Sequence, residues 1–199
     1  MNISDNHEQF GEGVIYKDIV PLKWRELGRN EAEFSYPRVQ KSNDEVLRFI
    51  TILDEFHADG YDETGSVSGS DLGHLEFKLD LLLDMVTQMM TRESDIPESF
   101  PMTLGSAGVE WITREPLKAG TLLELSLYLH HKYPRPFIVR GKVSEAKPAE
   151  DELGKYLIQF VFEQMSDVVQ AGLERLIFRQ HRRSIAQSRR AVNTLDENP

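Results

Sequence analysis

The densest group of side chains that could bind a ligand lies near the carboxyl end of the chain. Six arginines and one histidine fall between residues 175 and 190, and no acidic residue interrupts this run. Guanidinium groups donate paired hydrogen bonds to phosphates and carboxylates. We interpret Arg179, Arg182 and Arg183 as a candidate anion-binding cluster. The alternative is a solvated helix end, whose cations complement the negative end of the helix dipole.

The remaining reactive side chains lack the spacing that catalysis or metal binding requires. His57, His130 and His181 do not stand at a ligand or catalytic spacing from possible partners. The sequence has no cysteine, which excludes a disulfide framework, a thiolate zinc site and a thiol nucleophile. We expect no enzymatic activity, no metal ion and no cofactor.

The composition is that of one ordinary globular domain with an appendage, or of two very small domains. The chain has 199 residues, of which 40% are hydrophobic and 28% charged, and its formal net charge is -10. Because this mean charge repels phosphate backbones, we expect no DNA binding. The sequence contains no apolar run of the roughly 20 residues that span a bilayer and no signal peptide pattern. The expected location is the cytoplasm.

Two helical patterns follow each other between residues 43 and 92. The first covers about 43–59, and the second covers about 71–92. Apolar residues of the second recur at alternating steps of three and four, as in a heptad repeat: Leu72, Leu75, Leu79, Leu82, Val86 and Met89. A helix packed on its own domain gives the same stripe, but Leu83, Met85 and Met90 widen the apolar face. The resulting αα-hairpin has more apolar surface than two helices can hide, so we expect a homo-oligomer.

Most of the remaining sequence predicts strands. A stretch at 14–27, interrupted by Pro21, is expected to form an irregular or edge strand. Alternating patterns predict strands at 102–113, 121–130, 137–144 and 156–162, which together indicate an antiparallel sheet or a small barrel. A helix beginning near Ser166 closes the chain. Residues 1–13 and 189–199 are expected to be disordered.

Several sequence blocks occur in an order that resembles the PilZ domain. They are TLGSAGVEW at 103–111, PLKAG at 116–120, TLLELSLYL at 121–129, GKVSEA at 141–146, YLIQFVF at 156–162 and LERLIFRQHRR at 173–183. HLEFKLDLLLD at 74–84 looks like the helical insertion of the atypical, tetramer-forming branch of this family. The resemblance covers about residues 14–188. It implies an α+β fold, in which a small antiparallel PilZ-like β-barrel carries a long inserted αα-hairpin at about 43–92 and a C-terminal helix.

The resemblance also implies a ligand, because PilZ domains typically receive cyclic di-GMP. Typical members use an RxxxR pair ahead of the barrel and a [D/N]xSxxG strand motif. The second motif would fall on Thr103, Gly105 and Gly108, where only the last glycine agrees. An arginine pair four residues apart occurs in RELGR, at Arg25 and Arg29, but it precedes the helical insertion. Each lost charged hydrogen bond costs about 1.5–3 kcal/mol, so binding through the usual site is disfavoured.

Two functional hypotheses follow from these observations. The first is a non-catalytic, oligomeric PilZ-like regulatory module in bacterial cyclic di-GMP signalling, with a tetramer as the favoured assembly. It would act as an adaptor for an unidentified signalling protein and would carry a degenerate nucleotide site. The second is a direct cyclic di-GMP receptor that uses non-standard arginines, either the C-terminal cluster or the RELGR segment.

Overall fold

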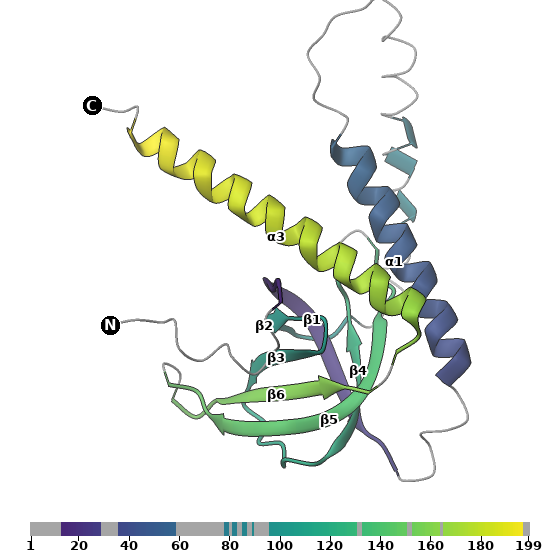
Figure 1. Cartoon of the computed structure of the whole chain (residues 1–199), viewed down its shortest axis with the longest axis vertical. Coiled ribbons are helices and arrows are strands. Elements are labelled where there is room, and N and C mark those ends of the chain that lie inside the picture. The colour runs from purple at the N-terminus through teal and green to yellow at the C-terminus, as the bar shows by residue number, and fades with distance from the viewer. Residues whose placement is uncertain are drawn as a thin grey trace, which may run out of the picture.

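The computed structural model describes most of the barrel and two long helices. The described residues are 13–28, 36–58, 78, 79, 81, 82, 85, 86, 89, 96–130, 133–150, 153–163 and 165–196. Six antiparallel strands form a closed barrel, and the helices α1 (Tyr36–Ala58) and α3 (Asp167–Asp196) pack against each other beside it (Figure 1). Helix α1 contacts the barrel at β5, and helix α3 contacts it at β1.

The barrel strands follow one another around the ring in the order β1-β2-β3-β6-β5-β4. Their bounds are β1 Tyr16–Glu26, β2 Ser99–Leu104, β3 Gly108–Thr113, β4 Leu122–Leu127, β5 Phe137–Pro148 and β6 Tyr156–Phe162. The alternation expected for 121–130 is confirmed, because Leu123, Leu125 and Leu127 are fully buried. Inside the barrel Trp111 packs edge-on against Phe160, with ring centroids 6.2 Å apart.

Strand β1 closes the barrel and is not the edge of an open sheet. Its first half, up to Pro21, pairs with β2, and its second half, from Leu22, pairs with β4. Proline has no N–H to donate to a ladder, so it is tolerated where the strand changes partners. The predicted strand 102–113 is in fact two strands, because a tight turn between Gly105 and Gly108 separates β2 from β3.

Helix α1 begins seven residues earlier than its apolar pattern predicts. Residues 36–42 show no helical apolar repeat, so the sequence pattern did not predict this first part of the helix. Asn43, which stands where we expected this helix to begin, is a fully buried residue inside the helix and binds the backbone of Ile138 on β5. Phe49 stacks on Tyr133 with ring centroids 4.2 Å apart, which adds a second contact between α1 and the segment before β5.

Helix α3 continues to Asp196, through residues for which we expected a disordered tail from 189 onward. No glycine or proline occurs between Gly172 and Asp196 to end the helix earlier. The first two turns of α3 bury Val169 and Leu173 against the rest of the domain. The expected disorder of residues 1–13 concerns positions that, except for Gly13, lie outside the described residues.

Candidate nucleotide site and assembly surface

The candidate nucleotide motif, Thr103, Gly105 and Gly108, lies at the end of β2 and in the turn that leads to β3. Thr103 is half-buried on β2, opposite Lys17 of β1 and Glu110 of β3. The turn is closed by the N–H of Gly105, which donates to the carbonyl of Gly108 at 2.9 Å. Gly105 and Gly108 are buried, so the motif presents one side chain, that of Thr103, where the family pattern has two polar groups.

Helix α3 holds the same turn from outside. Gln170 Nε2 donates to the carbonyl of Ser106 at 3.1 Å, and Phe162 N–H donates to the carbonyl of Ala107 at 2.9 Å. Two carbonyls of the turn are therefore already occupied by this chain's own donors. The turn is fixed by α3 and β6 and needs no ligand to order it.

A cavity of about 360 Å³ lies beside Thr103 on the outer surface of the barrel. Its charged lining residues are Lys17, Asp18 and Glu110. Gln159 Nε2 donates to Glu110 Oε1 at 2.8 Å, and both side chains are buried. Two carboxylates beside one ammonium group make this cavity unfavourable for a ligand with two phosphates.

The C-terminal arginine cluster is split by the structure. Arg183 Nη1 lies 2.6 Å from Asp54 Oδ1, and its Nη2 donates to the Asp54 carbonyl at 3.0 Å. Arg179 Nη1 lies 3.6 Å from Asp54 Oδ2, and the same guanidinium donates to the carbonyl and hydroxyl oxygens of Thr51. Asp54 is 5% exposed. Arg179 and Arg183 therefore fasten α3 to the end of α1, an arrangement that we call the Asp54 clamp.

Arg182 has a different environment from its two neighbours. It is exposed, and its guanidinium carbon lies 5.9 Å from the ring centroid of Phe178 on the next turn. Arg183 lines a cavity between the barrel and the two helices, and that cavity is not the one beside Thr103. The three arginines and the three motif residues do not form one site around either cavity.

The RELGR segment starts on β1, and its first arginine takes part in a charged ladder across three strands. Arg25 Nε lies 2.9 Å from Glu124 Oε1, and Arg140 Nη2 lies 2.8 Å from Glu124 Oε2. Burial raises the pKa of Glu124, but the hydrogen bonds and charges of Arg25 and Arg140 outweigh it and hold the pKa below its ordinary value. Arg29 lies outside the described residues.

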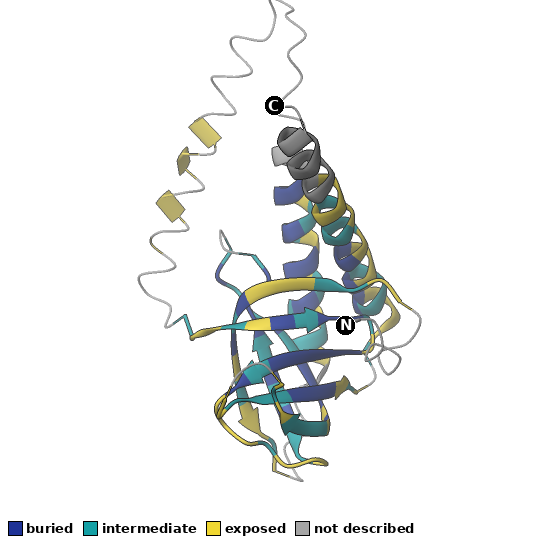
Figure 2. Cartoon of the chain, turned by 90° about the vertical axis from the view of Figure 1, so that its left-hand side faces the viewer, coloured by how far each residue is buried: buried dark blue, intermediate teal, exposed yellow. Residues whose placement is uncertain are grey.

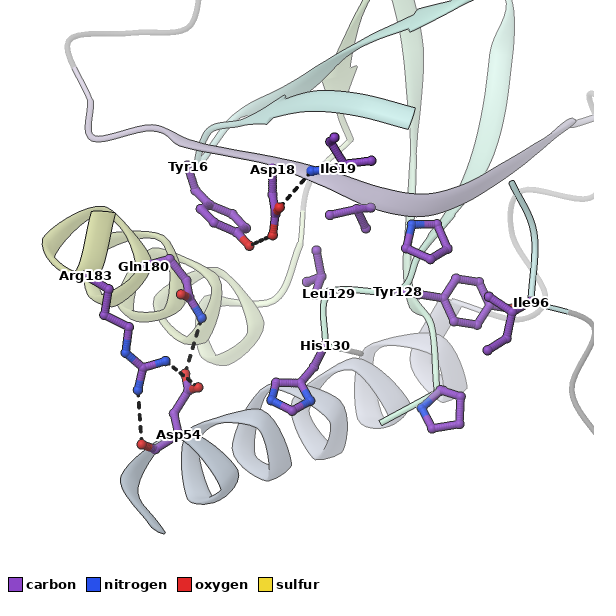
Figure 3. A pocket seen from close by; sticks show the side chains of 13 residues that line it. Tyr16, Asp18, Ile19, Asp54, Ile96, Tyr128, Leu129, His130, Gln180 and Arg183 are labelled. Atoms are coloured by element: carbon purple, nitrogen blue, oxygen red, sulfur yellow. Dashed lines mark hydrogen bonds and ion pairs between the residues drawn. The ribbon is translucent and has the colours of Figure 1, made fainter. Parts of the chain in front are cut away.

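A second cavity, of about 430 Å³, opens where the barrel meets the two helices (Figure 3). Its polar end holds the Asp54 clamp, His130 and the hydrogen-bonded pair of Tyr16 and Asp18. Burial, followed by the hydrogen bond and charge of Asp18, raises the pKa of the Tyr16 hydroxyl. Asp54 near the end of α1 and Ile96 just before β2 line this same cavity. The last turns of α1 and the residues just before β2, which are far apart in the sequence, thus meet at one cavity.

The predicted seam of the insertion is exposed wherever the structure describes it. Leu79, Leu82, Val86 and Met89 are helical, and their exposed fractions are 52%, 57%, 51% and 63% (Figure 2). Leu72 and Leu75 lie outside the described residues. The described seam side chains are therefore not buried against their own subunit.

Two residues that organise this region were not singled out from the sequence. Asp54 and Asn43 both fall on the buried side of α1 together with Ile50, where a polar residue is unusual. A polar side chain at a position of the apolar stripe is the signal that could have found them. Gln170 gave no such signal, because its partner is a backbone carbonyl more than sixty residues away.

The described residues contain no group of three or more His, Asp or Glu side chains arranged to hold a metal ion. None of the helices in the described part of the chain has the length and apolar character that crossing a membrane requires. The candidate surfaces are thus the motif turn, the arginine-bearing helix α3 and the seam of the insertion.

Comparison with protein-family models identifies the family to which this chain belongs. Residues 47–190, well over half of the chain, match the model described as "Atypical PilZ domain, cyclic di-GMP receptor". The chain belongs to the atypical PilZ domain family. The resemblance read from the ordered sequence blocks is confirmed, and so is the expected α+β architecture of barrel and helices. A comparison with curated proteins found no match.

Two solved structures resemble this chain at low sequence identity. A pathogenic protein of Xanthomonas campestris, a tetrameric PilZ domain that self-assembles through an unusual helical bundle, is 16% identical and has a TM-score of 0.67. The match covers 90% of this PilZ chain and 94% of that protein. The inhibitor of motility of Bacillus subtilis is 14% identical, with a TM-score of 0.36 over 41% of each chain.

Proposed function

We propose that this PilZ protein is a non-catalytic, oligomeric adaptor in bacterial cyclic di-GMP signalling whose own nucleotide site is degenerate. It assembles with copies of itself, and a tetramer is favoured. Each copy presents its barrel and helix α3 to a signalling protein. In this proposal it works in the cytoplasm, consistent with its cysteine-free sequence.

The observation that carries the proposal is the exposure of four apolar seam side chains among the helical residues that the structure describes between 78 and 89. Leu79, Leu82, Val86 and Met89 are each more than half exposed. Because a contiguous apolar stripe in water is costly, a partner surface is needed to cover it. The alternating spacing of three and four residues fits a helix from a second copy.

The ion pairs of the candidate arginines support a degenerate nucleotide site. Arg179 and Arg183 already neutralise Asp54, and Arg25 already pairs with Glu124. Recruiting any of them to a phosphate would remove one of the two arginines that pair with a buried or half-buried carboxylate, at a cost that offsets the new contact. Thr103 lies beside Glu110, which repels an anionic ligand.

A direct receptor is the second candidate, and one observation favours it. Arg182 is exposed and has no carboxylate partner among the described residues, so it is available to a phosphate. Arg182 with its neighbours on α3, or Arg25 with the remainder of RELGR, would then supply the charge that the motif turn lacks.

Calorimetric titration with cyclic di-GMP separates the two candidates. For the adaptor we expect no heat of binding at ligand concentrations up to about 1 mM, which corresponds to less than roughly 4 kcal/mol of binding free energy. Micromolar binding that is lost in Arg182→Ala but retained in Arg114→Ala, an exposed arginine outside α3, would establish the receptor instead.

Light scattering tests the assembly itself. The wild-type chain is expected to have the mass of an oligomer, and Leu79→Glu/Leu82→Glu is expected to have the mass of one chain. Leu81→Glu is the matched control, because Leu81 is 51% exposed on the same helix but off the seam. A wild-type protein that is monomeric at every concentration contradicts the proposal.

A further inference from the structure

The outward side of α3 carries a second stripe, which faces away from the barrel. We call it the outer seam; it consists of Val168, Ala171, Arg175, Phe178, Arg182 and Ile185. Its members follow one another at steps of three and four, and the exposed fractions of its large apolar side chains are 58% for Val168, 53% for Phe178 and 40% for Ile185. Figure 2 shows α3 with exposed residues along the side turned away from α1.

The outer seam differs in charge from the seam of the insertion. Arg175 donates within its own helix, to the carbonyl of Ala171 at 3.2 Å, and Arg182 lies over the ring of Phe178. Neither guanidinium has a carboxylate partner among the residues that the structure describes. By contrast, Arg179 and Arg183, one position along from the stripe, both pair with the carboxylate of Asp54. The outer seam therefore alternates apolar side chains with unneutralised positive charge.

The spacing and the charge together specify the partner. Steps of three and four are the pattern by which one helix packs along another. A second copy of α3 in parallel would place Arg175 and Arg182 against the same arginines, and like charges at facing seam positions disfavour that pairing. An anionic membrane fits less well, because the stripe is one helix face wide and exposed Glu174 borders it.

We propose that the outer seam of α3 docks an amphipathic helix of a different protein, with carboxylates facing Arg175 and Arg182 and apolar side chains facing Phe178 and Ile185. This inference rests on the adaptor function proposed above and names the surface through which it acts. The buried side of α3, which includes Val169 and Leu173, keeps the helix on the barrel while the outer seam stays open.

The test uses a fluorescein-labelled synthetic peptide of about four heptads, with Glu at every a position and Leu at every d position. Its binding to the full chain is followed by fluorescence anisotropy, with a second peptide that has Lys in place of Glu. We expect saturable binding of the acidic peptide that weakens as salt rises. Arg175→Glu/Arg182→Glu is expected to lower this affinity at least about tenfold and to gain binding of the Lys peptide.

Matched variants separate the charge pattern from general effects. Arg38→Glu/Arg114→Glu reverses the same number of exposed charges away from α3 and should bind the acidic peptide like the wild type. Phe178→Ala in the wild-type chain should weaken binding of the acidic peptide. The same substitution in the Arg175→Glu/Arg182→Glu chain should weaken binding of the Lys peptide. Circular dichroism establishes that each variant retains its helix content before its affinity is compared.

Four outcomes overturn the inference. The wild type could fail to bind the acidic peptide up to about 1 mM, or the reversed variant could bind it as tightly as the wild type. A change in the mass of Arg175→Glu/Arg182→Glu by light scattering would make the outer seam a contact between copies. Arginine-dependent co-sedimentation with phosphatidylglycerol vesicles, without peptide binding, would make it a membrane contact. The insertion variants and the nucleotide titration use other residues, so they report on the adaptor function separately.

Discussion

The side-chain amide of Asn43 on α1 and the backbone of Ile138 on β5 bind each other through two hydrogen bonds. Asn43 Nδ2 donates to the Ile138 carbonyl at 2.7 Å, and the Ile138 N–H donates to Asn43 Oδ1 at 2.9 Å. The amide thus occupies both backbone groups of a strand residue, as a neighbouring strand would. This pair fixes where α1, and with it the start of the helical insertion, is attached to the barrel.

Asn43→Ala is expected to lower the free energy of unfolding by about 2 kcal/mol, because the two backbone groups of Ile138 lose their partner and the buried amide leaves a gap. Urea denaturation of the purified chain measures this change. The control is Asp44→Ala, at the position next to Asn43 on α1, which removes an exposed ion pair with Arg48. It should lower the free energy of unfolding by less than about 0.5 kcal/mol. Equal losses in the two variants would contradict the structural role of Asn43.

Asp54→Ala is expected to destabilise the chain by about 3 kcal/mol, because two guanidinium groups of α3 lose the buried carboxylate that neutralises them. The contact between α1 and α3 should loosen first, which hydrogen exchange at the α3 amides near residue 180 detects. Asp18→Asn is a suitable control, since Asp18 is exposed and has no ion pair among the described residues. Unchanged exchange in Asp54→Ala would show that the clamp does not hold the helices together.

Gly141→Ala is expected to be among the most damaging single substitutions in the barrel. A Cβ at this position would collide with the carbonyl oxygen of Val161 on the neighbouring strand β6, and backbone cannot move aside without breaking the ladder. We expect a loss of about 3 kcal/mol or a failure to fold. Gly28→Ala, where a Cβ meets nothing within 4 Å, should unfold at the same denaturant concentration as the wild type.

The charged ladder of Arg25, Glu124 and Arg140 predicts how stability depends on pH. The folded-state pKa of Glu124 lies below its ordinary value of 4.5, so the folded chain binds the proton more weakly than the unfolded chain. This contribution to stability is present above pH 4.5 and is lost as the pH falls through the folded-state pKa. Thermal melts across this acidic range should show a shallower decline for Glu124→Gln than for the wild type. Parallel curves would mean that other carboxylates govern the acid transition.

The strand pattern and the family were predictable from the sequence, because side-chain alternation records which face of a strand is buried. Leu123, Leu125 and Leu127 fall in one row in the sequence and point into one core in the structure. The exposed apolar seam was predictable on the same principle, since Leu79 and Leu82 recur at helical spacing. These features are local, and each can be read within a few turns or one strand.

The Asp54 clamp and the split of the arginine cluster were not predictable, because they depend on contacts between distant parts of the chain. Arg179, Arg182 and Arg183 are equivalent cations in the sequence, but only the helical rotation of α3 against α1 decides which of them meets Asp54. The early start of α1 was missed for a related reason. Its first residues gain their stability from packing and from Asn43, and not from an apolar stripe of their own.

Asp54 near the end of α1 and Ile96 just before β2 line the same cavity, so the chain segment between them starts and ends at one place on the domain. The cost of closing a loop grows only with the logarithm of its length, so the barrel is nearly insensitive to how long the segment between these residues is. In the proposed assembly, lengthening or shortening that segment would change how far apart the barrels are held, while each barrel would keep its own architecture. Spacing and folding can therefore vary independently in this domain.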